Sequence, residues 1–134
     1  MHKQVWIKVN TQVDKGVAGI VKSLNRINGL FTLSSCEGYG ILNGRRGGGH
    51  VYFRYGKWNK LCKFVFGTLA PKLIEKFGEE IDLQVTVTND NDPIGEINFL
   101  TEIIPELDTL LKKLINTYCK SERSYGKVYN ISHN

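Results

Sequence analysis

The chain has 134 residues, of which 41% are hydrophobic and 23% charged, a composition typical of one globular domain that needs no disulfide or metal for stability. Its three widely spaced cysteines form no Cys-x-x-Cys pair and two of its three histidines lie near the termini, so no metal site is expected. No apolar run approaches the ~20 residues of a membrane span and the first residues resemble no signal peptide, so we expect a cytoplasmic protein without a membrane partner.

Charge is divided unevenly along the chain. Residues 1–66 contain eleven Lys and Arg against two acidic residues, a net charge of +9, whereas residues 67–134 contain seven against eleven, a net charge of −4. A strongly basic half favours an anionic partner. The same division also suits a solvated surface on which the two halves of the fold complement each other.

The first half of the chain is predicted to form three strands and one helix. Residues 5–9 alternate as a short strand. Asp14 is positioned to cap a helix with apolar residues at helical spacing, and Gly29 is positioned to end it. Residues 30–35 and 51–55 are strand-like runs, and the glycine-rich segment between them is expected to be a loop.

The second half is predicted to begin with a helix and a hairpin. The helix starts at about Asn59, and Gly67 and Pro71 are expected to kink or split it. Residues 81–88 alternate between apolar and polar side chains, as in a strand with one face on the core. The polar cluster 89–93 predicts a turn, followed by a returning strand.

A third helix is predicted to start near Thr101, with Pro105 in its first turn. A polar tail follows from about residue 120, in which residues 128–131 are candidates for an edge strand. The expected order β-α-β-β-α-β-β-α predicts an α+β fold, a two-layer sandwich whose mostly antiparallel sheet carries its helices on one face. Residues 1–134 are expected to form a single domain.

The glycine-rich segment is the first candidate binding site. Six of the twelve residues from Gly38 to Gly49 are glycine, with Arg45 and Arg46 among them. Backbone amides and guanidinium groups in such a segment can approach a ligand closely, and phosphate suits both. Arg45, Arg46 and Gly48 are therefore predicted to bind a nucleotide-like or phosphate-bearing ligand. A flexible hairpin tip has the same composition.

The strand that begins at Leu30 ends in small polar residues. The hydroxyls of Ser34 and Ser35 can bind a carboxylate, a ribose or a phosphate, or can bond to nearby backbone. Cys36 can act as a nucleophile if His50 or an arginine lowers its pKa, or can be a small buried apolar residue. Cys36 and His50 are the candidate catalytic residues.

Aromatic and basic residues are interleaved after His50. Tyr52 and Arg54, together with Arg45 and Arg46, are candidates to bind unpaired bases and phosphates, of RNA more than of DNA. Tyr52 and Arg54 can instead simply form the solvent face of a strand. Three acidic residues are candidates to line a cleft, although their spacing identifies no catalytic pair: Glu96, Glu102 and Asp108.

Residues 14–42 resemble a segment of a known family. They read as a helix and a strand followed by Ser34-Ser35-Cys36-Glu37-Gly38. This pattern resembles the helix–strand–SSCSGR segment of the wybutosine-synthesis tRNA methyltransferases, which modify a guanosine-derived base with S-adenosylmethionine. The resemblance implies that cofactor, a tRNA partner and ligand-binding roles for the residues that match the motif: Ser34, Ser35, Cys36 and Gly38.

Two positions depart from this family pattern. Glu37 stands where the family has a serine, and Tyr39 stands where it has an arginine. An arginine that contacts the family's ligand would here have to come from Arg45 or Arg46.

The sequence therefore predicts a small α+β protein that binds a nucleotide-like or phosphate-bearing ligand. Its enzymatic form would be an S-adenosylmethionine-dependent methyltransferase of the tRNA-modification type, without a metal. The alternative is a non-catalytic module that binds RNA or single-stranded DNA through the basic half. A structural or regulatory dimer is a third hypothesis. The sequence leaves open whether the protein is an enzyme.

Overall fold

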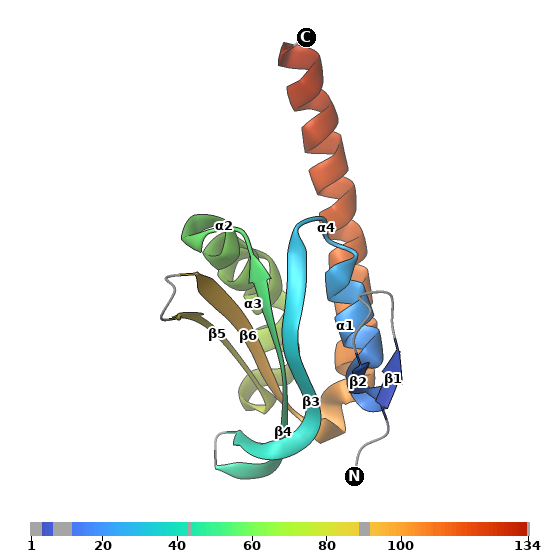
Figure 1. Cartoon of the computed structure of the whole chain (residues 1–134), viewed down its shortest axis with the longest axis vertical. Coiled ribbons are helices and arrows are strands. Elements are labelled where there is room, and N and C mark those ends of the chain that lie inside the picture. The colour runs from blue at the N-terminus through green and yellow to red at the C-terminus, as the bar shows by residue number, and fades with distance from the viewer. Residues whose placement is uncertain (1–3, 7–11, 43, 89–91, 134) are drawn as a thin grey trace.

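The computed structural model describes residues 4–6, 12–42, 44–88 and 92–133. Four strands form an antiparallel sheet in the order β3-β4-β6-β5, and two short strands form a separate ribbon (Figure 1). The strands are β1 Gln4–Trp6, β2 Gln12–Asp14, β3 Leu30–Leu42, β4 Arg45–Tyr55, β5 Ile81–Val87 and β6 Pro93–Leu100. The helices are α1 Ala18–Asn25, α2 Trp58–Cys62, the π-helical segment η2 Lys63–Leu69, α3 Ala70–Phe77 and α4 Ile104–His133, with 3-10 turns at η1 Lys15–Val17, η3 Gly78–Glu80 and η4 Thr101–Ile103.

One apolar core lies between the four-stranded sheet and the helices. Alternate residues of β4, namely Val51, Phe53 and Tyr55, are buried in it together with residues from α1, η2, α3 and α4. The ring of Phe64 on η2 packs edge-on against those of Phe53 and Tyr55, with centroids 6.0 and 5.2 Å apart. The predicted α+β sandwich, with a mostly antiparallel sheet and helices on one face, is confirmed. The other face of the sheet is left open.

The second hairpin follows the prediction closely. β5 covers Ile81–Val87, and β6 returns over Pro93–Leu100, where apolar residues alternate with polar ones. Residues 89–91 of the predicted turn lie outside the described residues. Period-two alternation identifies such strands well because one face is buried and the other is not.

The glycine-rich loop is the largest error of the sequence prediction. Most of residues 38–49 is strand, because β3 continues to Leu42 and β4 begins at Arg45, and together the two strands form a long curled hairpin (Figure 1). Register shifts between Cys36 and Gly40 and between Gly40 and Ile41 mark irregular pairing. Glycine tolerates the bends and close strand approach that such irregularities require.

The N-terminal region also differs from the prediction. The described part of the first strand, β1, covers Gln4–Trp6, and the remaining residues of the predicted strand, 7–9, lie outside the described residues. A second strand, β2, is added. The Asp14 side chain forms no capping bond with the helical turn that follows it. Its Oδ2 instead accepts a hydrogen bond from the backbone N–H of Glu37 at 3.1 Å, so Asp14 ties the ribbon to β3.

The helix predicted from Asn59 is continuous, but its geometry changes along its length. It runs from Trp58 to Phe77 with its middle, Lys63–Leu69, in π-helical geometry. Pro71 lies in the first turn of α3, directly after this wider segment. Since proline cannot donate the backbone hydrogen bond of an α-helix, a change of helix type just before it is a physically reasonable accommodation.

The edge strand expected at residues 128–131 is wrong, because α4 continues as a helix from Ile104 to His133 and extends well past the sheet (Figure 1). A helix satisfies its backbone hydrogen bonds within itself, whereas a strand needs a neighbouring edge. Within the part of the chain that the structure describes, no helix has both the length and the apolar character that crossing a membrane requires.

Candidate functional site

Two rows of polar side chains cross the open face of the sheet. Directly paired residues of neighbouring antiparallel strands lie on the same face, so the strand register defines each row. The first row contains Cys36 on β3, His50 on β4, Asn98 on β6 and Asp82 on β5. The second row contains Ser34, Tyr52, Glu96 and Gln84 on the same four strands.

Hydrogen bonds and ring contacts connect the β3 and β4 ends of these rows. The Oγ of Ser34 and the Nε2 of His50 are 2.9 Å apart. The His50 ring stacks on the Tyr52 ring with centroids 4.2 Å apart and planes 26° apart. The Tyr52 hydroxyl donates to Oδ1 of Asn98 at 3.4 Å. The imidazole is therefore held from two sides.

Carboxylates occupy the β5 and β6 ends. The Gln84 amide donates to Oδ2 of Asp82 at 2.6 Å, and the Thr86 hydroxyl donates to Oε2 of Glu96 at 2.9 Å. Each of these bonds uses one carboxylate oxygen. A carboxylate has two oxygens that each accept more than one hydrogen bond, so both acids keep acceptor capacity for a ligand.

A cavity of about 400 Å³ lies over these rows. The curled end of the β3–β4 hairpin forms one wall, and the polar side chains of β4, β5 and β6 form the rest. The lining residues are Ile41, Leu42, Gly48, Gly49, His50, Tyr52, Asp82, Gln84, Glu96 and Asn98. This volume falls in the range of small-molecule sites in proteins.

Burial controls the protonation of the two rings. The pKa of His50 is lowered from its usual 6.5, mainly because burial disfavours the cation, while the negative charges of Glu96 and Asp14 partly oppose this effect. The pKa of Tyr52 is raised by burial and by Glu96. At neutral pH the cavity therefore contains a neutral imidazole, a neutral phenol and the two carboxyl groups of Asp82 and Glu96.

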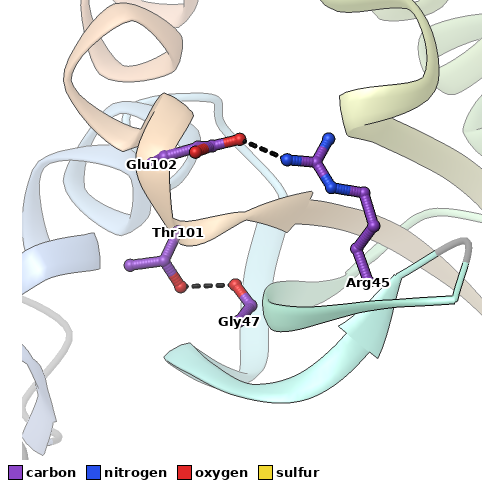
Figure 2. A network of polar contacts seen from close by, with 4 residues as sticks. All are labelled: Arg45, Gly47, Thr101 and Glu102. Atoms are coloured by element: carbon purple, nitrogen blue, oxygen red, sulfur yellow. Dashed lines mark hydrogen bonds and ion pairs between the residues drawn. The ribbon is translucent and has the colours of Figure 1, made fainter.

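The predicted arginines lie elsewhere. Arg45 Nη2 forms an ion pair with Glu102 Oε1 at 2.8 Å, and Figure 2 shows the guanidinium directed at η4. Neither Arg45 nor Arg46 is among the described residues that line the cavity. The structure thus brings Ser34, Cys36 and His50 together on one face, but does not bring Arg45 to them.

Three further residues were predicted to bind the ligand: Gly38, Gly48 and Ser35. A Cβ at Gly38 would overlap the Thr101 hydroxyl, and one at Gly48 would lie 3.1 Å from the backbone N of Leu42. Ser35 pairs with the buried Val51, so its side chain belongs to the face opposite that of Ser34. Gly48 lines the cavity, whereas Gly38 and Ser35 are not among the described residues that line it, and binding of a ligand by all three stays a prediction.

The residues predicted to bind nucleic acid are also separated. Tyr52 and Arg54 share the open face, where Arg54 Nη1 pairs with Asp92 Oδ2 at 2.7 Å. Arg45 is bonded to η4 instead. Tyr52 and Arg54 are both half-buried on the open face, and Tyr52 lines the cavity, so binding of nucleic acid by these residues stays a prediction.

Of the three acidic residues expected to line a cleft, Glu96 does so. Asp108 instead pairs with Lys112 at 3.6 Å. Sequence reasoning missed three polar residues that line the cavity, Asp82, Gln84 and Asn98. Their signal was the polar half of the alternation in β5 and β6, which is also the pattern of an ordinary solvated strand. The described part of the chain brings no three His, Cys, Asp or Glu side chains close enough together to hold a metal ion.

Thr101 fastens the curled hairpin to the end of β6. Its Oγ1 lies 2.5 Å from the Gly47 carbonyl oxygen and 2.6 Å from that of Glu37, so one hydroxyl serves both strands (Figure 2). We expect Thr101→Val to lower the free energy of unfolding by about 1–2 kcal/mol in urea titrations, because these carbonyls lose their partner. The matched control is Thr109→Val, whose hydroxyl bonds only its own helix at Pro105 and whose loss should change stability by less than ~0.5 kcal/mol. Equal effects of the two substitutions would show that the fastening is energetically unimportant.

Comparisons of the chain with family models, with curated proteins and with solved structures found no match. The resemblance carried by residues 34–38 therefore stays a prediction.

Proposed function

We propose that this protein binds a nucleoside-type ligand in the cavity on the open face of its sheet. The observation that carries the proposal is the composition of the cavity, which combines a stacked pair of rings at one side with two carboxylates and two amides at the other. A nucleoside has the same division between a planar base and a hydroxyl-bearing sugar.

The rings of His50 and Tyr52 suit the base. They lie nearly parallel, and both are uncharged at neutral pH because burial shifts their pKa values toward the neutral forms. Flat aromatic side chains bind bases by stacking, at about 1–3 kcal/mol for each base.

The carboxylates suit the sugar or a positive charge. Asp82 and Glu96 accept hydrogen bonds from hydroxyl and amino groups, and Gln84 and Asn98 add amide groups beside them. The same carboxylates repel a phosphate inside the cavity. A nucleoside is therefore better supported than the phosphate-bearing ligand that the glycine-rich segment suggested.

S-adenosylmethionine, the cofactor implied by the resemblance, fits these residues. It is a nucleoside that also carries a cationic sulfonium, a cationic amine and one carboxylate, and Asp82 and Glu96 would face the sulfonium and the amine. When bound, it supplies an activated methyl group. Methylation of a tRNA base thus remains the enzymatic form of the proposal.

A general RNA or single-stranded DNA module has less support, because Arg45 and Arg54 each pair with a carboxylate.

Calorimetric titration with four ligands tests the proposal. We expect S-adenosylmethionine to bind more tightly than S-adenosylhomocysteine, which lacks the sulfonium charge, and adenosine to bind more tightly than adenosine monophosphate. Glu96→Gln should weaken the binding of S-adenosylmethionine by about tenfold, or about 1.4 kcal/mol. The difference in affinity between S-adenosylmethionine and S-adenosylhomocysteine should then be smaller than in the wild type. The control is Glu75→Gln, an exposed acid on α3 away from the cavity. Absence of heat for all four ligands at about 1 mM, or a preference for the monophosphate, would refute the proposal.

A further inference from the structure

Ser34 and His50 form a hydroxyl–imidazole pair at the edge of the cavity. Their Oγ and Nε2 atoms are 2.9 Å apart, the distance expected between a nucleophilic hydroxyl and the base that activates it. Neighbouring strands position the pair, since Ser34 is paired with Tyr52 and Cys36 with His50. The stacked Tyr52 ring fixes the plane of the imidazole.

The imidazole is in the form that such a reaction needs. A base must be neutral to accept a proton, and burial lowers the pKa of His50 against the opposing effect of Glu96 and Asp14. At neutral pH the ring is therefore uncharged, and in the tautomer that carries its proton on Nδ1 its Nε2 can accept the Ser34 proton. A role for His50 as a base follows from this state together with the 2.9 Å geometry.

A substrate can reach Ser34. Its side chain is exposed on β3, which is an edge strand of the sheet. Outward N–H groups of this strand already bind oxygen atoms, because Thr32 donates to Asn25 Oδ1 at 3.4 Å and Glu37 donates to Asp14 Oδ2 at 3.1 Å.

We propose that Ser34 and His50 are the nucleophile and general base of an acyl transfer from a carboxylic ester to water. The Ser34 oxygen bonds to the carbonyl carbon while His50 Nε2 takes the hydroxyl proton. The bond from this carbon to the alcohol oxygen then breaks, and that oxygen takes the proton from His50. Water adds to the acyl-serine with its proton passing to His50, and Ser34 leaves with that proton. The products are a carboxylic acid and an alcohol.

The surroundings define the class of ester. The alcohol part lies in the polar cavity next to His50, so a hydroxyl-rich alcohol is preferred. The acyl part lies toward Phe31, which is on β3 like Ser34. Phe31 is paired with Arg54, so its side chain lies on the open face, where it is 66% exposed. An apolar acyl group suits that side chain. Resting on the proposed function, the substrate is an O-acyl nucleoside.

Hydrolysis of p-nitrophenyl acetate tests the pair without requiring the cavity. We expect release of p-nitrophenol by the wild-type chain and an acetyl group on the peptide that contains Ser34, detected by mass spectrometry after an acid quench. Ser34→Ala should abolish the acetyl-serine, and both Ser34→Ala and His50→Gln should lower the rate by about 100-fold. In the wild type the rate should rise with pH, and the midpoint of this rise should lie below pH 6.5, following the lowered pKa of His50.

A hydroxyl away from the cavity provides the matched control. Thr109→Val removes a hydroxyl that bonds only its own helix at Pro105, and this variant should retain the wild-type rate. Circular dichroism establishes that each variant is folded. A wild-type rate in Ser34→Ala, or acetyl found only on Cys36 or on lysines, would overturn the proposal.

The same assays separate this proposal from the nucleoside site. If adenosine fails to bind while p-nitrophenyl acetate turnover depends on Ser34, the proposed function fails and acyl transfer stands. If adenosine binds but no acetyl-serine forms, only acyl transfer is overturned. If both hold, 3′-O-acetyladenosine should be hydrolysed at least tenfold faster than ethyl acetate, and Glu96→Gln should reduce that preference.

Discussion

Gly49→Ala is expected to lower the free energy of unfolding by about 3 kcal/mol, at the upper end of the range for overpacked sites. A Cβ at this position would lie 2.6 Å from the carbonyl oxygen of Cys36, 2.7 Å from Cε2 of Phe99 and 3.0 Å from the carbonyl carbon of Glu37. Two of these atoms belong to the backbone of β3 and the third to a fully buried ring. None can move away without disturbing either the β3–β4 pairing or the core.

Gly67→Ala is the matched control for this substitution. Gly67 is exposed in the π-helical segment, and the nearest atom to its added Cβ is Cγ of Lys63 at 3.9 Å. Alanine is more favourable than glycine in a helix by about 0.5–1 kcal/mol, so this variant should equal or exceed the wild type in stability. Urea unfolding followed by circular dichroism measures both changes. A loss below ~1 kcal/mol for Gly49→Ala would mean that the two strands approach less closely than described.

The second large effect is expected at alkaline pH, from a pair of tyrosines in the core. The hydroxyls of Tyr55 and Tyr118 are 2.7 Å apart, and burial raises the pKa of both above the usual 10. The shared hydrogen bond raises that of Tyr118 further and lowers that of Tyr55, while the negative charge that Glu122 carries raises both. The folded chain thus keeps both phenols protonated at a pH where the unfolded chain loses their protons.

The sign of the pH effect follows from linkage. A phenol whose pKa is raised on folding gives full stability below pH 10, and that stability is lost as the pH rises above 10 toward the folded-state pKa. We expect the unfolding free energy to fall steeply between about pH 10 and 12. The double variant Tyr55→Phe/Tyr118→Phe should show a much shallower decline, although it loses about 1 kcal/mol at pH 8 from the missing hydrogen bond. Parallel declines in the two proteins would contradict this origin.

Much of the architecture could be predicted from the sequence because alternation and helical spacing report burial directly. β5 and β6 are the clearest cases, since Leu83, Ile97 and Phe99 are buried in the core while the polar residues between them lie on the open face. The glycine-rich segment 38–49 could not be recognised as strand because glycine carries no side chain to reveal which face is buried. The helix over 128–131 was missed because its β-branched and aromatic residues suit a strand locally, while the helix continues from α4.

The candidate site was only partly predictable for a related reason. The proximity of Ser34 to His50 depends on strand register, and β3 has a register shift between Thr32 and Ser34 that no local pattern announces. A one-residue shift moves every following side chain to the opposite face. The predicted link from Arg45 to these residues failed because an acid distant in sequence, Glu102, competes for the guanidinium.

β3 is a thirteen-residue strand at the border of the sheet, and such borders can recruit strands from other molecules into insoluble fibrils. The bonds from Thr32 to Asn25 and from Glu37 to Asp14 occupy two backbone donors that a foreign strand would need. These two bonds thus protect part of a long border from pairing with other copies of the chain. Loss of the Asn25 or the Asp14 side chain should therefore cause turbidity in concentrated solutions before it alters ligand recognition.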